Sequence, residues 1–140
     1  NQASATPMDV TPPRPVHLLH ATIVTPNKEV LLEWNKSASW DTKGYNIWKR
    51  DGLSGVFSLL GSTADTFYKE SGPEISASHC YFIEPFDYCN NKGEWSNAGC
   101  IIIIKGSTAP GRNNISWNEY KEWTHGAAYY NVYRNTDSTG

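Results

Sequence analysis

Apolar and polar residues alternate with a period of two along much of this chain, which is the pattern of β-strands that bury one face. In the stretch His79–Tyr88, for example, Tyr81 and Ile83 fall on one face and the even-numbered residues on the other. The alternation and the short apolar runs predict these strands before residue 106: Val16–Val24, Glu29–Asn35, Gly44–Arg50, Val56–Gly61, Thr66–Lys69, His79–Tyr88 and Trp95–Lys105, the last being one strand or two joined end to end. Turn-forming residues separate the strands, and no stretch shows a helical period. The chain is therefore predicted to be all-β, built as an antiparallel β-sandwich.

Two landmarks of this pattern occur twice. The strand that ends at Trp34 is repeated by one that ends at Trp117, 83 residues later, and Tyr45 is repeated by Tyr130, 85 residues later. Repeats in solenoid proteins are only about 20–50 residues long. The longer interval indicates that a whole small domain is repeated.

These landmarks divide the chain into three parts. Residues 1–15 contain four prolines and no periodicity, which predicts an extended linker. Residues 16–105 are expected to form a first domain, and residues 106–140 the N-terminal part of a second. An alternative boundary lies near residue 99, because the run Ile101–Ile104 suits either the last strand of the first domain or the first strand of the second. Little linker remains in either case, so the domains are expected to abut.

The second domain is expected to be incomplete. Residue 140 corresponds to residue 55 of the first copy. Half a sandwich cannot cover its own inner face, since each β layer buries its apolar side against another layer. We therefore expect the chain to be a fragment of a longer protein.

Composition excludes two classes of partner. The formal net charge is −2 and the pI is about 6.1, with acidic and basic residues interspersed, so the chain lacks the basic stripe that binds nucleic acid. No apolar run approaches the roughly 18 residues of a membrane-spanning helix, so no membrane insertion is expected. The six tryptophans and eight tyrosines favour pleated, half-buried surfaces.

The three cysteines leave two alternatives open. Cys80 and Cys100 lie on runs expected to be antiparallel neighbours around a turn near Asn90, which brings them opposite one another within reach of a bridge. Pairing Cys89 with Cys100 would need a skewed register. The residues predict either a Cys80–Cys100 disulfide or reduced thiols in the core, and they leave the state of Cys89 open.

No arrangement of residues indicates catalysis or a metal site. The four histidines are expected at surface or edge positions, and no nucleophile motif or phosphate-binding loop accompanies them. The carboxylates are scattered rather than paired. Asp87 and the turn Asn90-Asn91 supply oxygen atoms, but without the spaced acidic loop of a calcium site. The chain is predicted to be non-enzymatic, with no metal and no cofactor.

Aromatic residues are the remaining candidates for a binding site. Trp34 and Trp117 are expected in the core, because tryptophan recurs at the same point of an apolar strand. Trp40, Trp95 and Trp123 lie in or beside loops and are better placed to form an exposed platform for sugar rings. Packing rather than binding is the favoured interpretation even for these three.

The chain resembles the fibronectin type III superfamily. The resemblance is carried by the lead-in Thr11–Pro15, the strand that ends at Trp34, the run Tyr45–Arg50, and the segment Tyr81-x-Ile83-x-Pro85-x-Asp87, where Tyr81 matches the corner tyrosine of the penultimate strand. Pro85 departs from the superfamily, which usually has a small apolar residue there, and predicts a bulge or an edge position. The resemblance implies a fibronectin type III-like sandwich, followed by the start of a second one.

A narrower resemblance concerns the second copy. The segment Trp117–Arg134 is similar to repeats in gliding-motility-associated surface proteins of the Bacteroidota, which leave the cell through the type IX secretion system. Those proteins often combine a Cys-Tyr strand with a later Ser-Asn-x-x-Cys segment, present here as Cys80-Tyr81 and Ser96–Cys100. The resemblance therefore favours the Cys80–Cys100 bridge.

The sequence as a whole predicts a non-enzymatic, extracellular spacer or adhesin-type segment of a larger cell-surface protein, exported as a type IX substrate. The alternative is an accessory, carbohydrate-binding module of a secreted polysaccharide-degrading enzyme. The expected partners are neighbouring domains of the same chain and, through the resemblance, the secretion translocon or other surface proteins.

Overall fold

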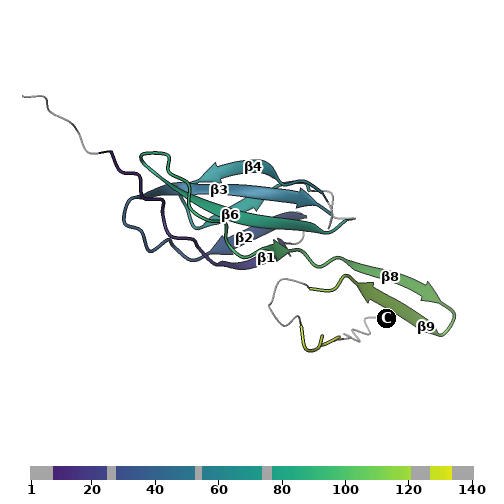
Figure 1. Cartoon of the computed structure of the whole chain (residues 1–140). Coiled ribbons are helices and arrows are strands. Elements are labelled where there is room, and N and C mark those ends of the chain that lie inside the picture. The colour runs from purple at the N-terminus through teal and green to yellow at the C-terminus, as the bar shows by residue number, and fades with distance from the viewer. Residues whose placement is uncertain (1–7, 25–27, 53–54, 74–76, 121–126, 134–140) are drawn as a thin grey trace, which may run out of the picture.

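The computed structural model describes residues 8–24, 28–52, 55–73, 77–120 and 127–133 (Figure 1). Its elements within these ranges are all strands: β1 (Leu18–Val24), β2 (Glu29–Trp34), β3 (Thr42–Asp51), β4 (Ser58–Thr63), β5 (Phe67–Glu70), β6 (His79–Asp87), β7 (Gly99–Cys100), β8 (Ile104–Ala109) and β9 (Arg112–Trp117). The first six confirm predicted strands, with ends displaced by at most two residues. The last predicted strand is two, β7 and β8, and it begins at Gly99 rather than at Trp95. No helix long and apolar enough to cross a membrane occurs in the described ranges.

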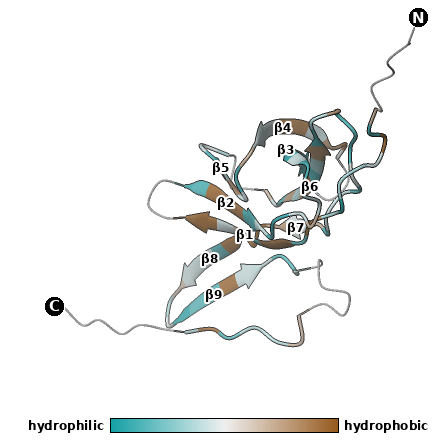
Figure 2. Ribbon diagram, turned by 90° about the vertical axis from the view of Figure 1, so that its left-hand side faces the viewer, coloured by the Kyte–Doolittle hydropathy of each residue, from teal (hydrophilic) through white to brown (hydrophobic). Residues whose placement is uncertain are grey.

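Strands β1 to β7 form two antiparallel sheets that pack face to face (Figures 1 and 2). One sheet has the order β1-β2-β5 and the other β4-β3-β6-β7. The side chains between the sheets form one apolar cluster: Val16, Leu18, Val30, Leu32, Trp34, Tyr45, Ile47, Tyr81, Ile83, Ile101 and Ile103. The predicted antiparallel sandwich is confirmed.

Alternation along the strands decides which residues enter this core. In β2 the even-numbered residues Val30, Leu32 and Trp34 are buried and their neighbours are only half-buried. In β3 and β6 the odd-numbered residues point inward, as the sequence predicts for Tyr81 and Ile83. Burial of one such side chain contributes about 1.5–3 kcal/mol, so this cluster supplies most of the stabilisation of the fold.

Pro85 keeps its place in the β3–β6 ladder, opposite Tyr45. It lies where β6 has passed the end of β7, and its carbonyl oxygen accepts a hydrogen bond of 2.8 Å from the amide of Gly93. The backbone groups of residue 85 thus face the β6–β7 connection rather than β3, so the missing N–H of proline removes no hydrogen bond between β3 and β6. The ladder irregularity that the residue predicts is found nearby, between Thr42 and Gly44 of β3.

The proline-rich segment contacts the sandwich over its described part, residues 8–15. Pro13 is buried, and Arg14 exchanges hydrogen bonds with two serines of the β2–β3 connection, donating to Ser39 Oγ at 2.9 Å and accepting from Ser37 Oγ at 2.8 Å. Gly93 makes this contact feasible, because a Cβ there would lie 2.8 Å from Pro85 Cγ and closer still to the carbonyl oxygen of Pro13.

Replacing Gly93 by alanine is expected to lower the free energy of unfolding by about 1–3 kcal/mol, the usual effect of an added methyl group in a packed site. The clash involves backbone, which cannot move aside as a flexible side chain would. Urea denaturation measures the change. Gly106→Ala is the matched control, since its Cβ would meet nothing nearer than 3.9 Å and is expected to change stability by less than about 0.5 kcal/mol. Equal effects of the two substitutions would contradict the close contact.

The isoleucine run takes part in both units. Gly99–Cys100 pairs with β6 as the last strand of the sandwich, and Ile104 begins the β8–β9 hairpin after three intervening residues. Ile101 and Ile103 are 0% and 8% exposed in the sandwich core, whereas Ile102 and Ile104 point away from it and are 38% and 70% exposed. Alternate side chains of one extended segment therefore serve the sandwich and the hairpin.

The hairpin β8–β9 is a shortened version of β1–β2. Leu18 pairs with Trp34 and Ile104 with Trp117, so the spacing is three residues shorter in the second copy. Two fewer residues separate the strands of the hairpin, and the bulge after Leu18 has no counterpart in it. The segment 127–133, which repeats part of β3 in sequence, does not form a strand.

Candidate functional site

The outer face of the four-stranded sheet carries a cluster of aromatic rings. Because the odd-numbered residues of β3 and β6 fill the core, the even-numbered ones, including Trp48 and Phe82, point outward. Trp95, from the β6–β7 connection, stacks on Trp48 with ring centroids 5.3 Å apart and an interplanar angle of 27°. It also contacts Phe57 at 5.4 Å and Phe82 at 5.3 Å. We call these four rings the aromatic platform.

Glu84 holds both indoles of the platform by their N–H groups. Its Oε1 accepts from Trp95 Nε1 at 3.1 Å, and its Oε2 accepts from Trp48 Nε1 at 3.3 Å and from Asn46 Nδ2 at 2.9 Å. Glu84 as a whole is 7% exposed, and Lys92 Nζ lies 3.8 Å from its Oε2. Fixed rings of this kind lose little conformational entropy when a ligand binds.

The platform can offer an apolar surface but no obvious chemistry. Trp95 is 40% exposed, so part of its ring remains available to a ligand. The Glu84 carboxylate already accepts three hydrogen bonds and is placed to orient rings rather than to transfer protons. Asn46, Ser62 and Lys92 supply polar groups near the rings.

The structure treats the three loop tryptophans differently. Trp95 joins the platform, whereas Trp40 is 95% exposed beside a hollow lined by Asp9 and Asp41 and has no ring contact within the described residues. Trp123 lies outside the described residues. Trp48, Phe57, Phe82 and Glu84 were not anticipated, although the opposite parity of Trp48 and the buried Ile47 was a signal that Trp48 faces outward.

Three carboxylates meet at the end of the sandwich where the N-terminal segment lies. Asp9, Asp41 and Asp87 each place one oxygen within 4.8 Å of the others, and they are the residues whose hard oxygen ligands could hold a divalent cation. The buried Asp87 carboxylate also has structural partners, because it accepts from the amides of Cys89 and Asn91 and from Asn91 Nδ2, each at 2.8 Å. The backbone N–H of Thr11 holds the pKa of Asp9 below its ordinary value.

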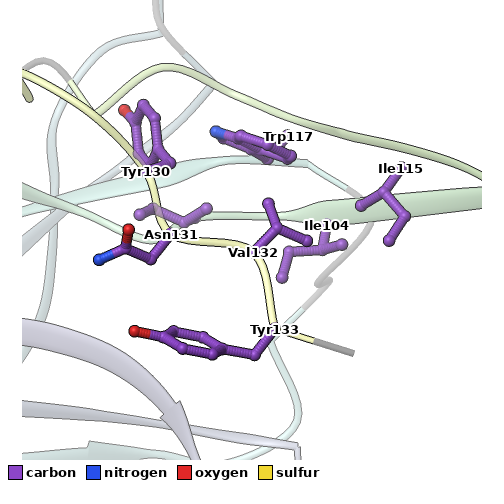
Figure 3. Close-up of a pocket in the computed structure, with 8 residues that line it drawn as sticks. Ile104, Ile115, Trp117, Tyr130, Asn131, Val132 and Tyr133 are labelled. Carbon is purple, nitrogen blue, oxygen red and sulfur yellow. The ribbon is translucent and has the colours of Figure 1, made fainter. Parts of the chain in front are cut away.

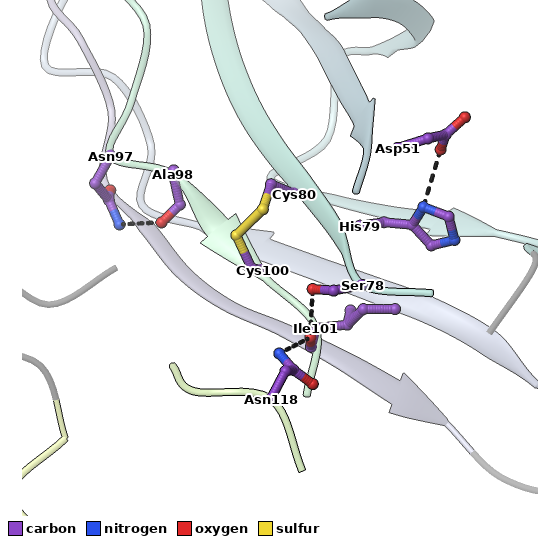
Figure 4. Close-up of a disulfide and its surroundings, with 9 residues drawn as sticks. All are labelled: Asp51, Ser78, His79, Cys80, Asn97, Ala98, Cys100, Ile101 and Asn118. Carbon is purple, nitrogen blue, oxygen red and sulfur yellow. Dashed lines mark hydrogen bonds and ion pairs between the residues drawn. A yellow bond between two sulfur atoms is a disulfide. The ribbon is translucent and has the colours of Figure 1, made fainter. Parts of the chain in front are cut away.

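Cys80 and Cys100 lie directly opposite one another on β6 and β7 and form a disulfide, with Cα atoms 4.0 Å apart (Figure 4). The bridge favoured by the sequence is confirmed. Cys89 is a free, exposed thiol. The disulfide fastens the short strand β7, just before the segment that leads into the hairpin.

A largely buried ion pair joins the two sheets. Lys49 Nζ of β3 lies 2.6 Å from Glu70 Oε1 of β5, and the hydroxyl of Tyr81 donates to Glu70 Oε2 at 2.7 Å. His79, expected at a surface or edge position, is instead 3% exposed, with Nδ1 2.9 Å from Asp51 Oδ1 (Figure 4). The expectation was wrong because His79 begins a central strand whose whole length lies against neighbouring elements.

The hydrogen bond from Tyr81 to Glu70 predicts that the free energy of unfolding depends on pH. Burial, and then the hydrogen bond to Glu70, raises the pKa of Tyr81 far above its ordinary value near 10. The folded state therefore favours the neutral phenol, and this contribution to stability is present below about pH 10 and is lost as the pH rises above it. Tyr81→Phe is expected to flatten the decline of unfolding free energy between about pH 10 and 11.

Urea denaturation at several pH values measures this decline. Tyr88→Phe is the control, because the Tyr88 side chain is 74% exposed and its loss is expected to leave the curve unchanged. A decline of the same steepness in Tyr81→Phe and in the wild type would show that Tyr81 does not contribute to it.

Solved structures of other proteins share the arrangement of two packed antiparallel sheets. The sequence matches no protein-family model and no curated protein. Among solved structures, the twitchin kinase region of C. elegans (Fn31-NL-kin-CRD-Ig26) matches 65% of this chain with a TM-score of 0.55 and 18% identity. The chain has a fibronectin type III-like fold. The similarity is one of fold alone, and the chain spans only 16% of the twitchin structure.

Two further structures match less well. They are pectate lyase Pel3 from Pectobacterium carotovorum, with a TM-score of 0.49, 12% identity and coverage of 69% of this chain and 27% of that one, and titin module A71 from human cardiac muscle, with a TM-score of 0.47, 18% identity and coverage of 67% and 89%.

Proposed function

We propose that this chain is a non-enzymatic segment of a larger modular protein, in which fibronectin type III-like sandwiches follow one another and hold other parts of the protein at a distance. The observation that carries the proposal is the shared isoleucine segment. Because Ile101 and Ile103 are anchored in the first core while Ile104 already pairs in the hairpin, no free linker separates the units.

The junction is held by hydrogen bonds as well as by packing. Asn118, just after β9, accepts from the amide of Ile103 at 2.6 Å. It also donates to the carbonyl oxygen of Ile101 at 3.1 Å (Figure 4). One side chain thus fixes the connecting segment against the hairpin. Such a junction resists bending, as a spacer requires.

The finer proposal is that the protein is extracellular and reaches the cell surface as a substrate of the type IX secretion system. Its support is the similarity of Trp117–Arg134 to repeats in gliding-motility-associated proteins. The buried Cys80–Cys100 disulfide is in keeping with an oxidising compartment, where such bonds form and persist.

The spacer role is tested by deleting this segment from its parent protein and by replacing it with an unrelated domain. Deletion of residues 16–117 is expected to abolish the activity of the whole protein, and an unrelated β-sandwich of similar length in the same place is expected to restore it. A spacer depends on length and stiffness rather than on surface side chains. If the unrelated sandwich fails as the deletion does, specific side chains of this segment are required and the spacer proposal is wrong.

The aromatic platform favours a second candidate, a carbohydrate-binding module. Exposed tryptophan rings stack on the apolar faces of sugars, and Trp95 is held with part of its ring exposed. A glycan array probed with the wild type and with Trp95→Ala tests this function. Trp40→Ala is the matched control, because Trp40 is more exposed but lies outside the platform. Binding that is lost only in Trp95→Ala would establish the module, and an array without binding would exclude it for the glycans presented.

A further inference from the structure

A hollow of about 320 Å³ lies beside the β8–β9 hairpin and is lined almost entirely by apolar side chains (Figure 3). The lining residues are Ile102, Ile104, Ile115, Trp117, Tyr130, Asn131, Val132 and Tyr133. Several are strongly exposed, with values of 70% for Ile104, 52% for Ile115 and 60% for Val132. A contiguous apolar surface of this kind marks an interaction site.

The first copy contains the same surface in a covered state. Six of the lining residues, Ile102, Ile104, Ile115, Trp117, Tyr130 and Val132, take the places of Val16, Leu18, Leu32, Trp34, Tyr45 and Ile47, all of which are 5% exposed or less. The central aromatic pair has the same edge-to-face geometry in both copies. Trp34 and Tyr45 have centroids 5.5 Å apart at 70°, and Trp117 and Tyr130 have centroids 5.4 Å apart at 63°.

Two hydrogen bonds recur as well. Asn35 Oδ1 accepts from the amide of His17, and Asn118 Oδ1 accepts from that of Ile103. The hydroxyl of Tyr45 accepts from the amide of Ser37 at 3.2 Å, and that of Tyr130 accepts from Tyr120 at 2.8 Å. The hairpin and the segment around Tyr130 are therefore already arranged as one half of a sandwich core.

The first copy also shows what covers such a half. β5 pairs along the free edge of β2, from Val30 opposite Glu70 to Glu33 opposite Phe67. β6, through Tyr81 and Ile83, belongs to the opposite layer and closes the core. In the described ranges β9 pairs with β8 alone.

We propose that this hollow is a docking surface for two further β-strands of the same polypeptide. One extends the sheet along β9 as β5 does along β2, and the other covers Ile115, Trp117 and Tyr130 as β6 covers their counterparts. A second copy of this chain is a poorer occupant, because its β5 and β6 are already used in its own sandwich. The inference deepens the proposed modular function and rests on it.

A graft built from the chain itself tests the inference. Residue 140 corresponds to residue 55, so a duplicate of residues 56–103 is appended after Gly140 to supply the counterparts of β4 to β7. The graft also carries Asn113→Val, because Asn113 stands where the first copy buries Val30 and would otherwise meet the core as a polar group. Hydrogen exchange of the β9 amides is expected to slow by on the order of 100-fold or more relative to the ungrafted Asn113→Val chain.

The matched control carries the same graft with its copies of Tyr81 and Ile83 changed to serine, and its β9 amides are expected to exchange as in the ungrafted chain. Unchanged exchange in the apolar graft would overturn the inference. So would an ungrafted chain that forms dimers in sedimentation and protects Ile115, since the occupant would then be a second copy. Replacement of residues 16–117 by an unrelated sandwich can fail to restore activity while this graft protects β9, so the two proposals are tested separately.

Discussion

Glu70→Ala is expected to lower the free energy of unfolding by about 3–5 kcal/mol, the usual effect of removing one partner of a buried ion pair. The Lys49 and Glu70 side chains are only 14% and 11% exposed. The lysine left behind would have little access to water and would keep only a longer contact of 3.6 Å with the exposed carboxylate of Asp51. The hydroxyl of Tyr81 would lose its acceptor in the same substitution. Because the pair joins β3 to β5, the two sheets would lose a polar connection at this end of the core.

Urea or thermal denaturation measures this effect. Glu33→Ala is the matched control, because Glu33 also forms an ion pair, with His20 at 3.0 Å, but both side chains are about half exposed, at 45% and 57%. Exposed pairs contribute about 0–1 kcal/mol. The double substitution Lys49→Met with Glu70→Leu is expected to recover much of the loss, since no unpaired charge then remains buried. A small effect of Glu70→Ala, comparable to that of Glu33→Ala, would show that the pair is hydrated in solution.

Removal of the disulfide by Cys80→Ala together with Cys100→Ala is expected to lower the free energy of unfolding by about 3 kcal/mol. The two cysteines are separated by 20 residues, and a cross-link across a loop of that length restricts the unfolded chain substantially. Because β7 contains only Gly99 and Cys100, its pairing with β6 is expected to weaken first. Hydrogen exchange of Ile101, whose amide donates to the carbonyl oxygen of His79 at 3.0 Å, reports on this edge.

The exposed Cys89 supplies the control for the disulfide. Cys89→Ser is expected to change stability by less than about 0.5 kcal/mol, because the thiol has no bonded partner and lies at the surface. A reducing agent added to the wild type is expected to reproduce the double substitution. If the double substitution left stability unchanged, the ladder between β6 and β7 would be sufficient without the covalent bond.

The two proposed functions depend on different residues, those of the aromatic platform and those of the junction between the sandwich and the hairpin. The junction depends on main-chain continuity and on Asn118. The proposed spacer role therefore does not depend on the side chains at the surface. The platform depends on Trp95, Trp48 and Glu84 and would matter only if a ligand uses it. Substitutions at Trp95 therefore separate the two proposed functions, because they alter the platform and leave the junction intact.

Local pattern was sufficient for the strands and for the repeat. Period-two alternation located the strands β1 to β6 to within two residues, because one buried face imposes it on each strand independently of the rest of the chain. The expected turn near Asn90 placed Cys80 opposite Cys100, and the family resemblance favoured the bridge that the structure contains. The recurrence of tryptophan and tyrosine in two copies could be read from the sequence. Only the structure showed that the two tryptophan–tyrosine pairs have the same ring geometry.

What the sequence by itself determined about this protein is thus its all-β class, its strands and its two related units. Only the tertiary structure decided which contacts join distant segments, such as Lys49 with Glu70, Trp48 with Trp95, and Asp9 with Asp87. It alone also showed that odd-numbered isoleucines enter the first core while even-numbered ones face the second unit. The physical reason is that alternation specifies two faces for each strand, but which neighbour covers each face depends on how the sheets pack.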